Sequence, residues 1–138
     1  MKTRKQNKAG FTLVELMVVA IIVAILAAVA IPMMSGNKKR AMGTEAEAGI
    51  GTILSSARVY LAEHDQYPAT LANLNMISST DLDGQFFDYV DYSFTGTSSN
   101  TYTIACTGTA TSGRGDDEGK SVGMAVTLDE DGIWTRNY

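Results

Sequence analysis

The chain has 138 residues, which suits one modest globular domain and one additional element. Its net charge of −4 is unevenly spread: the first ten residues carry four cations and no acid, whereas residues 41–138 carry fourteen acids and four cations. Because an acidic domain has no electrostatic footprint for phosphates, we expect no direct nucleic-acid binding by the monomer.

The first predicted element is an apolar helix close to the N-terminus. Residues 16–31 contain no polar side chain, and flanking apolar residues extend the run to the roughly 20 that a helix needs to cross a bilayer. The cations of residues 1–10 place the N-terminus on the cytoplasmic side of the membrane. One carboxylate, Glu15, stands just ahead of the run. An acidic side chain at membrane depth is costly, which favours a functional partner for Glu15.

Three interpretations of this segment compete. A secretory signal peptide would have a basic start, an apolar stretch and a small-residue cleavage site, here Ala28-Val29-Ala30, and the mature chain would begin at Ile31. A plain membrane anchor would keep the helix. We expect neither of these two to account for Glu15.

The third interpretation rests on the residues KAGFTLVE at positions 8–15, followed by the apolar run and by Pro32. Over about the first 34 residues the chain resembles the type IV pilins and the related pseudopilins. The resemblance implies that a prepilin peptidase of the inner membrane cuts between Gly10 and Phe11, and that Phe11 is then N-methylated. A glycine before the cleaved bond is suitable because a backbone without Cβ can be approached closely.

Cleavage would remove the leader cations and create an α-amino cation at Phe11. By the resemblance, this amine meets Glu15 of a neighbouring copy in a filament, a pair that gains roughly 4 kcal/mol before desolvation at an effective dielectric near 20. Repeated head-to-tail contacts do not close, so they build open helices. The resemblance therefore implies three protein partners: further copies of this chain, the prepilin peptidase and an inner-membrane assembly platform.

Pro32 predicts a bend or local opening of the helix, because proline lacks an amide hydrogen and clashes with the carbonyl four residues back. The alternative is that Pro32 only marks the exit from the membrane. After a basic group at residues 38–40, apolar positions with three-four spacing predict that the helix continues to about His64. These positions are Met42, Ala46, Ile50, Ile53, Leu54, Ala57 and Leu61. We expect the charged residues between them to face water: Glu45, Glu47, Arg58 and Glu63.

The remainder of the chain predicts a sheet. Tyr67-Pro68 ends the helix, and a short helical turn is expected after Thr70. Apolar residues then alternate with polar ones in three strands, whose inward residues are Val90, Tyr92 and Phe94, then Tyr102, Ile104 and Cys106, then Val122, Met124, Val126 and Leu128. The turn at 129–132 leads to a last short strand at 133–135, a hairpin signal.

These elements predict an α+β fold: a long N-terminal helix, apolar in its first half and amphipathic in its second, packed on a C-terminal antiparallel sheet. The expected organisation is a leader at 1–10, a membrane and filament-core half-helix at 11–34, an amphipathic half-helix at 35–64 and a globular head at 65–138.

Cys106 is the single cysteine, so no intrachain disulfide can form, although the resemblance implies that relatives often close this region with one. We expect a buried structural thiol; the alternative is a reactive or intermolecularly paired one. The Gly-, Thr-, Ser- and Asp-rich stretch between Cys106 and Val122 predicts a flexible loop.

The sequence predicts no catalytic, phosphate-binding or metal-binding site in the head. GRGDDEGKS at 113–121 lacks the first glycine of a phosphate-binding loop, and Arg114-Gly115-Asp116 is treated as a chance match to an adhesion tripeptide. The acids at 116–118 and 129–131 lack the spacing of a calcium loop, so no metal site is predicted. Without paired carboxylates, a Ser-His-Asp set or metal-spaced His and Cys, we expect neither an enzyme nor a cofactor.

We therefore expect a structural subunit of a type IV pilus that serves adhesion, motility or uptake. It would sit in the inner membrane as a precursor and at the cell surface after assembly. The alternatives within the resemblance are a minor pilin and a pseudopilin of a type II secretion system, which would stay in the periplasm. A further alternative is a secreted or anchored binding module with an ordinary signal peptide.

Overall fold

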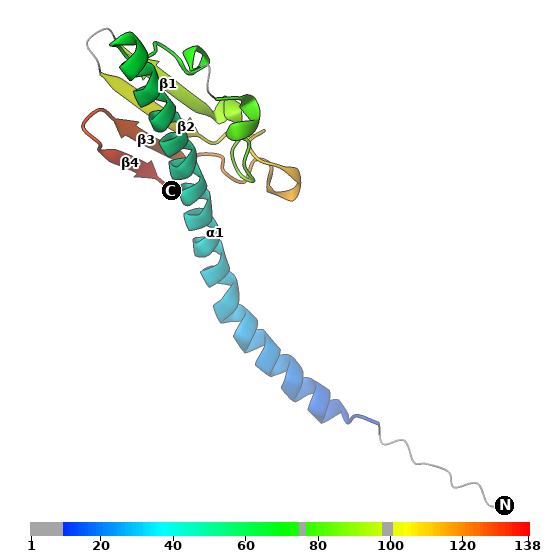
Figure 1. Cartoon of the computed structure of the whole chain (residues 1–138). Helices are drawn as coiled ribbons and strands as arrows, with labels where there is room; N and C mark the ends of the chain where they lie inside the picture. The colour runs from blue at the N-terminus through cyan, green and yellow to red at the C-terminus, as the bar shows by residue number, and fades with distance from the viewer. Residues whose placement is uncertain (1–9, 75–76, 98–100) are drawn as a thin grey trace, which may run out of the picture. The chain divides into compact units, whose positions relative to one another are not determined.

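The computed structural model describes residues 10–74, 77–97 and 101–138 (Figure 1). The order of the helices (α), 3₁₀ helices (η) and strands (β) is α1 (Leu13–His64), η1 (Leu71–Asn73), η2 (Ser79–Asp81), η3 (Tyr89–Asp91), β1 (Tyr92–Gly96), β2 (Tyr102–Thr107), η4 (Gly115–Asp117), β3 (Ala125–Asp129) and β4 (Trp134–Asn137). The chain divides into two compact units, Met1–Asn37 and Lys38–Tyr138, and each is described by itself.

In the first unit, α1 starts at Leu13 and is helical through Pro32. The Ser35 hydroxyl donates a hydrogen bond of 2.8 Å to the Pro32 carbonyl. The large apolar side chains are exposed along the whole segment, from Val14 at 66% to Met34 at 71%. Within the described residues, the large apolar side chains of this segment are therefore left without a cover. The bend expected at Pro32 stays a prediction.

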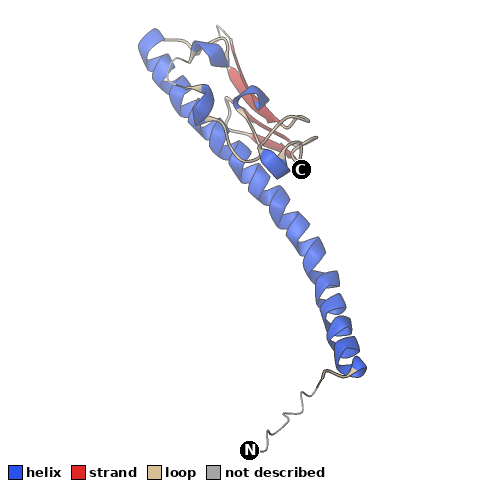
Figure 2. Ribbon diagram, turned by 90° about the vertical axis from the view of Figure 1, so that its right-hand side faces the viewer, coloured by secondary structure: helices blue, strands red, loops and turns tan. Residues whose placement is uncertain are grey.

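In the second unit, α1 lies along one face of the sheet (Figure 2), and buried side chains of both form one hydrophobic core. The buried helix positions are Met42, Gly43, Ala46, Ile50, Ile53 and Ala57, which follow the predicted three-four spacing. They meet buried sheet residues, of which Ile104, Cys106 and Val126 are fully covered. The predicted α+β layout, a long N-terminal helix and a C-terminal antiparallel sheet, is confirmed.

The sheet is an antiparallel meander with the order β1-β2-β3-β4. Its register places Cys106 between Tyr92 of β1 and Val126 of β3, so that their side chains share one face. The outer edge of β1 is covered by the connection from the helix, where the Gly96 amide donates to the Ala69 carbonyl at 3.2 Å.

Two of the residues predicted to point inward from strands lie outside the strands and are exposed, whereas Met124, just before β3, is buried as predicted. Val90 belongs to η3 and is 77% exposed, because the Asp91 amide bonds the Asp88 carbonyl and turns the chain just before β1. Val122 is 58% exposed, and Gly123, with φ of +81°, separates it from the strand that begins at Ala125. The last strand is β4, one to two residues later than predicted, since the turn extends through Ile133.

The prediction that Glu45 faces water is wrong, and Glu47 is half-buried in a surface ion pair, whereas Arg58 and Glu63 are exposed as predicted. Glu45 Oε1 accepts hydrogen bonds from the backbone amides of Phe86 (2.7 Å) and Phe87 (2.9 Å). Glu47 Oε1 accepts one of 2.5 Å from Arg136 Nε. Helical periodicity cannot reveal these partners, because they come from loops and a strand more than forty residues away.

The loop between β2 and β3 is tied down more firmly than its composition predicts. Asp91 is only 5% exposed, and its Oδ1 accepts from Ser112 Oγ (2.6 Å) and Thr109 Oγ1 (3.2 Å). The Ser121 hydroxyl donates to the Phe86 carbonyl at 3.0 Å. Hydrogen bonds to a buried carboxylate hold this loop without a disulfide.

Candidate functional site

The helix begins with a capping box made by Thr12 and Glu15. The amide and the hydroxyl of Thr12 donate to Glu15 Oε2 at 2.8 and 2.7 Å. The Glu15 amide donates in return to Thr12 Oγ1 at 3.3 Å. The box satisfies two of the four backbone amides that a helix leaves without partners at its start.

This geometry corrects the view that a plain anchor leaves Glu15 unexplained. Thr-x-x-Glu ahead of an apolar run is a recognised sequence signature of a helix start, and it stands at positions 12–15. The sequence therefore contains a local structural explanation for the carboxylate, which stands beside the functional one. Both bonds use Oε2, and within the described residues Oε1 accepts no hydrogen bond.

Gly10 and Phe11 lie immediately before the box, outside the helix and exposed. A Cβ added at Gly10 would meet no atom of the described residues within 4 Å, so these residues leave the backbone there open to approach. The predicted leader at 1–10 lies outside the described residues except for Gly10. The structure thus places Gly10, Phe11 and Glu15 together at one helix end, and Pro32 some five turns further along.

The apolar segment that follows is long enough to span a bilayer. From Leu13 to Met34 the helix rises roughly 33 Å, against a hydrocarbon thickness of about 30 Å. By length and composition, α1 is the helix in the described residues that could cross a membrane. Glu15 lies close to the start of this segment, where a charge costs less than at its centre.

Side chains of the head contact α1 at the start of the second unit. The Lys38 ammonium pairs with Asp117 and lies 5.6 Å from the centroid of the Phe86 ring. On another side of the helix, the Tyr138 ring covers Gly43, where a Cβ would come within 2.4 Å of the ring. The hydrogen bond from Lys38, and to a smaller extent the one from Gln85, holds the pKa of the Asp117 carboxyl below its usual range.

Cys106 is buried, as predicted. Burial raises the pKa of its thiol to about 12, so the sulfur stays protonated at neutral pH. A protonated, covered thiol is a poor nucleophile and packs as a small apolar group.

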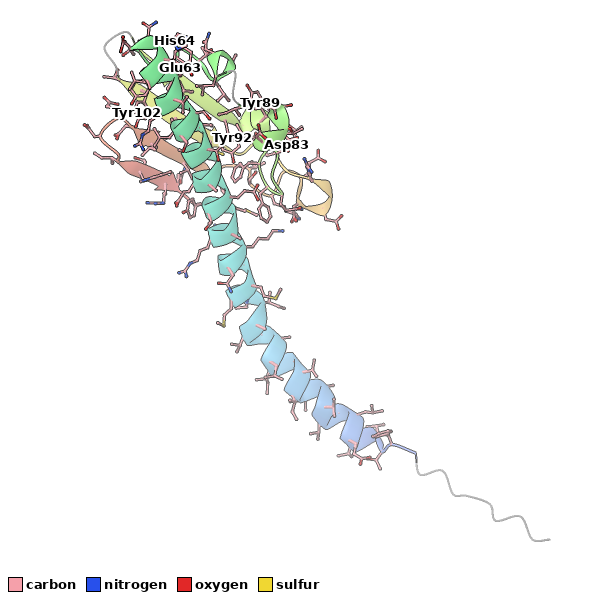
Figure 3. All side chains as sticks on the ribbon, viewed as in Figure 1. Glu63, His64, Asp83, Tyr89, Tyr92 and Tyr102 are labelled. Carbon is pink, nitrogen blue, oxygen red and sulfur yellow. The ribbon has the colours of Figure 1, made fainter. Side chains whose placement is uncertain are left out.

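In the part of the chain that the structure describes, no three His, Cys, Asp or Glu side chains are arranged to hold a metal ion. The two acidic stretches have other contacts. Asp117 pairs with Lys38, and Asp129 Oδ1 accepts a hydrogen bond of 2.8 Å from the Ile133 amide. His64, the single histidine, stacks on Tyr60 at a centroid distance of 4.0 Å, and Figure 3 shows it beside Glu63 where α1 ends.

Comparison with known proteins matches the helix start and the apolar segment to a family model described as the prokaryotic N-terminal methylation motif, over residues 5–31. The chain is 35% identical to type II secretion system core protein G of Klebsiella michiganensis over 74 residues, covering 54% of this chain and 52% of that protein. It is 38% identical over 82 residues to a fimbrial protein of Neisseria meningitidis, covering 59% and 48%.

A third relative is competence protein ComGC of Halalkalibacterium halodurans, which is 38% identical over 71 residues. That match covers 51% of this chain and 70% of the relative. The matched stretches span about half the length of the secretion and fimbrial relatives.

Proposed function

This chain belongs to the family of type IV pilins and pseudopilins, and from that premise we propose that it is the structural subunit of a type IV pilus. In this proposal the precursor sits in the inner membrane, is cleaved between Gly10 and Phe11, and is N-methylated at Phe11. The mature chain then assembles into a helical homopolymer at the cell surface. Its partners are the peptidase, an assembly platform and further copies, and it has neither catalytic activity nor a cofactor of its own.

The observation that carries the proposal is the exposed apolar surface of the first unit. Large apolar side chains from Val14 to Met34 are at least half exposed in the isolated chain. Fully burying one such side chain is worth about 1.5–3 kcal/mol, so the segment needs a cover outside its own chain. Lipid supplies this cover first, and the same segments of other copies supply it in the filament.

After cleavage, Glu15 has a second role besides capping the helix: it pairs with an α-amino group. The new α-amino cation at Phe11 stands at the same helix end as the box. Thr12 holds Oε2, and Oε1 is left to accept a cationic amine from the next copy. An unpaired charge within an apolar filament core is penalised, so this pairing selects the axial register between copies.

A second candidate is a pseudopilin of a type II secretion system. The observation that favours it is the similarity to secretion system core protein G, which at 35% identity is close to the 38% found for the fimbrial protein. The processing and the assembly chemistry would be the same, but the filament would be short and would remain in the periplasm.

The experiment that tests the proposal is intact-mass analysis and N-terminal sequencing of the chain, recovered separately from cell envelopes and from sheared surface material. An abundant chain in the sheared fraction that starts at N-methylated Phe11 supports the type IV pilus. The same start confined to the envelope supports the pseudopilin or a minor pilin. A start at Ile31, or an uncut chain, overturns both candidates, because Glu15 would then have no amine to meet.

A further inference from the structure

A basic pair, Lys39 and Arg40, stands exposed at the start of the second unit. Lys38 beside it is paired with Asp117, but neither side chain of the basic pair makes an ion pair among the described residues. The residues outside the description contain no Asp or Glu, so they cannot supply a partner. Two cations thus remain uncompensated on a unit that is otherwise strongly acidic.

An acidic turn of opposite charge joins β3 to β4. Asp129 closes this turn through its bond to the Ile133 amide. Glu130 and Asp131 at its tip are exposed, and their side chains make no hydrogen bond or ion pair with the described part of the chain. The tip therefore presents two carboxylates that the head itself does not use.

The basic pair and the acidic turn lie far apart along α1. Tyr138, just beyond the end of β4, covers Gly43, close to the basic pair. The strand rises about 3.3 Å per residue, so the turn lies roughly 20 Å from Tyr138. The turn lies toward the C-terminal end of the helix (Figure 1). Asp129 at its start pairs with Thr103, which pairs with Thr95. The next residue, Gly96, bonds Ala69, shortly after the end of α1. No salt bridge within one chain spans that distance.

We propose that the basic pair of one copy binds the acidic turn of another copy in the filament. The inference rests on the proposed function and adds a contact between heads to the contact between helices. Two different surfaces displaced along the helix form a heterologous contact, which repeats without closing and therefore suits a fibre. The contact also offsets the repulsion between acidic heads and fixes their register, since electrostatic complementarity acts mainly through specificity.

The test is a charge swap in the full-length chain, in the cell that naturally assembles it. K39E/R40E and E130K/D131K each place like charges face to face, and each is expected to lower the yield of sheared filaments about tenfold or more. The combined four-site variant restores opposite charges and is expected to recover most of the wild-type yield. The intact mass of the envelope fraction, read beside the yield, shows whether each variant is still cleaved after Gly10.

The matched control is D116K/E118K, which makes the same charge change on two exposed acids of a different loop. Combined with K39E/R40E, it is expected to give no recovery. Reversed variants that assemble at the wild-type level overturn the inference. So does a K39E/R40E defect that E130K/D131K does not repair, which would assign the basic pair to another partner such as anionic lipid. If the wild-type chain itself forms no filament, the proposed function fails, an outcome distinct from both.

Discussion

The two units of the chain use apolar residues in opposite ways. Along the helix up to Met34 they are exposed on every side, whereas from Met42 to Ala57 they form one buried stripe against the sheet. The second pattern needs only the chain's own sheet as a partner. Among the described residues the first pattern meets no apolar partner, and in the proposed function lipid and then other copies of the chain cover it. One helix thus combines an exposed apolar segment, which the proposed function assigns to assembly, with a segment that packs in the core of the head.

The largest expected effect comes from removing the charge of Glu15 while keeping its cap. In E15Q the amide oxygen can still accept from Thr12, so the helix start is preserved, but no ion pair with an amine can form. A lost pair of roughly 4 kcal/mol before desolvation corresponds to a fall in assembled filament of about a hundredfold or more. Sheared-filament yield measures this, with the mature mass as the control for cleavage.

The reciprocal variant is T12V, which removes the hydroxyl of the box and leaves the carboxylate. It is expected to reduce filament yield less than E15Q does, because capping contributes only about 0.5–2 kcal/mol. Normal filaments from E15Q would mean that the carboxylate acts as a cap alone, and the head-to-tail pairing of amine and acid would have to be abandoned.

A pair of isoleucine truncations tests the contrast between the two units directly. Ile104 is fully buried in the sheet core, whereas Ile21 is half exposed. I104A is expected to lower the free energy of unfolding of the head by about 2–5 kcal/mol. I21A is expected to leave it unchanged. Thermal unfolding of the full chain in detergent, followed by near-ultraviolet circular dichroism, compares the two, and equal destabilisation would contradict the division into units.

The buried carboxylate of Asp91 is the next target. D91N leaves Ser112 and Thr109 with a neutral acceptor in place of a charged one, and it is expected to cost about 1–3 kcal/mol in the same unfolding measurement. S112A removes one donor and is expected to cost less. If D91N unfolded at the wild-type temperature, the loop between β2 and β3 would not depend on this network.

The parts of the fold that were predictable from sequence are those with a local period. The stripe from Met42 to Ala57 and the alternation along β2 translate directly into burial. The helix end near His64 followed from the proline shortly after it. Val90 and Val122 had the right polarity for strands, but a turn and a glycine of positive φ next to them changed the backbone.

The contacts that could not be predicted are those between distant segments. Glu45 looked like an exposed helix residue, yet its carboxylate caps the backbone of a loop around Phe86. Asp91 looked like a polar strand residue, yet it ties two loops together. At the N-terminal site the reverse holds, since the box between Thr12 and Glu15 is a local pattern of four residues and can be predicted from the sequence.

The smallest expected effect concerns acid pH and the attachment of the head to α1. Hydrogen bonds from Lys38 and Gln85 lower the pKa of Asp117 in the folded chain, so the unfolded chain binds a proton there more readily. The stabilisation is therefore present above the pKa of an ordinary aspartate, about 3.9, and is lost as the pH falls through the lower folded value. Above pH 5 the pairing is complete and unfolding should not respond to pH through this group.

D117N is expected to weaken the pH dependence of the unfolding temperature below pH 5. As the pH is lowered from 5, the unfolding temperature of D117N should fall less than that of the wild type. D116N changes a neighbouring exposed acid and serves as the control that should keep the wild-type slope. Because the pair is solvent-accessible, salt should weaken it as well. An identical slope in D117N and the wild type would show that the pair between Lys38 and Asp117 contributes nothing to the stability of the head, which would then rest on its other contacts with α1.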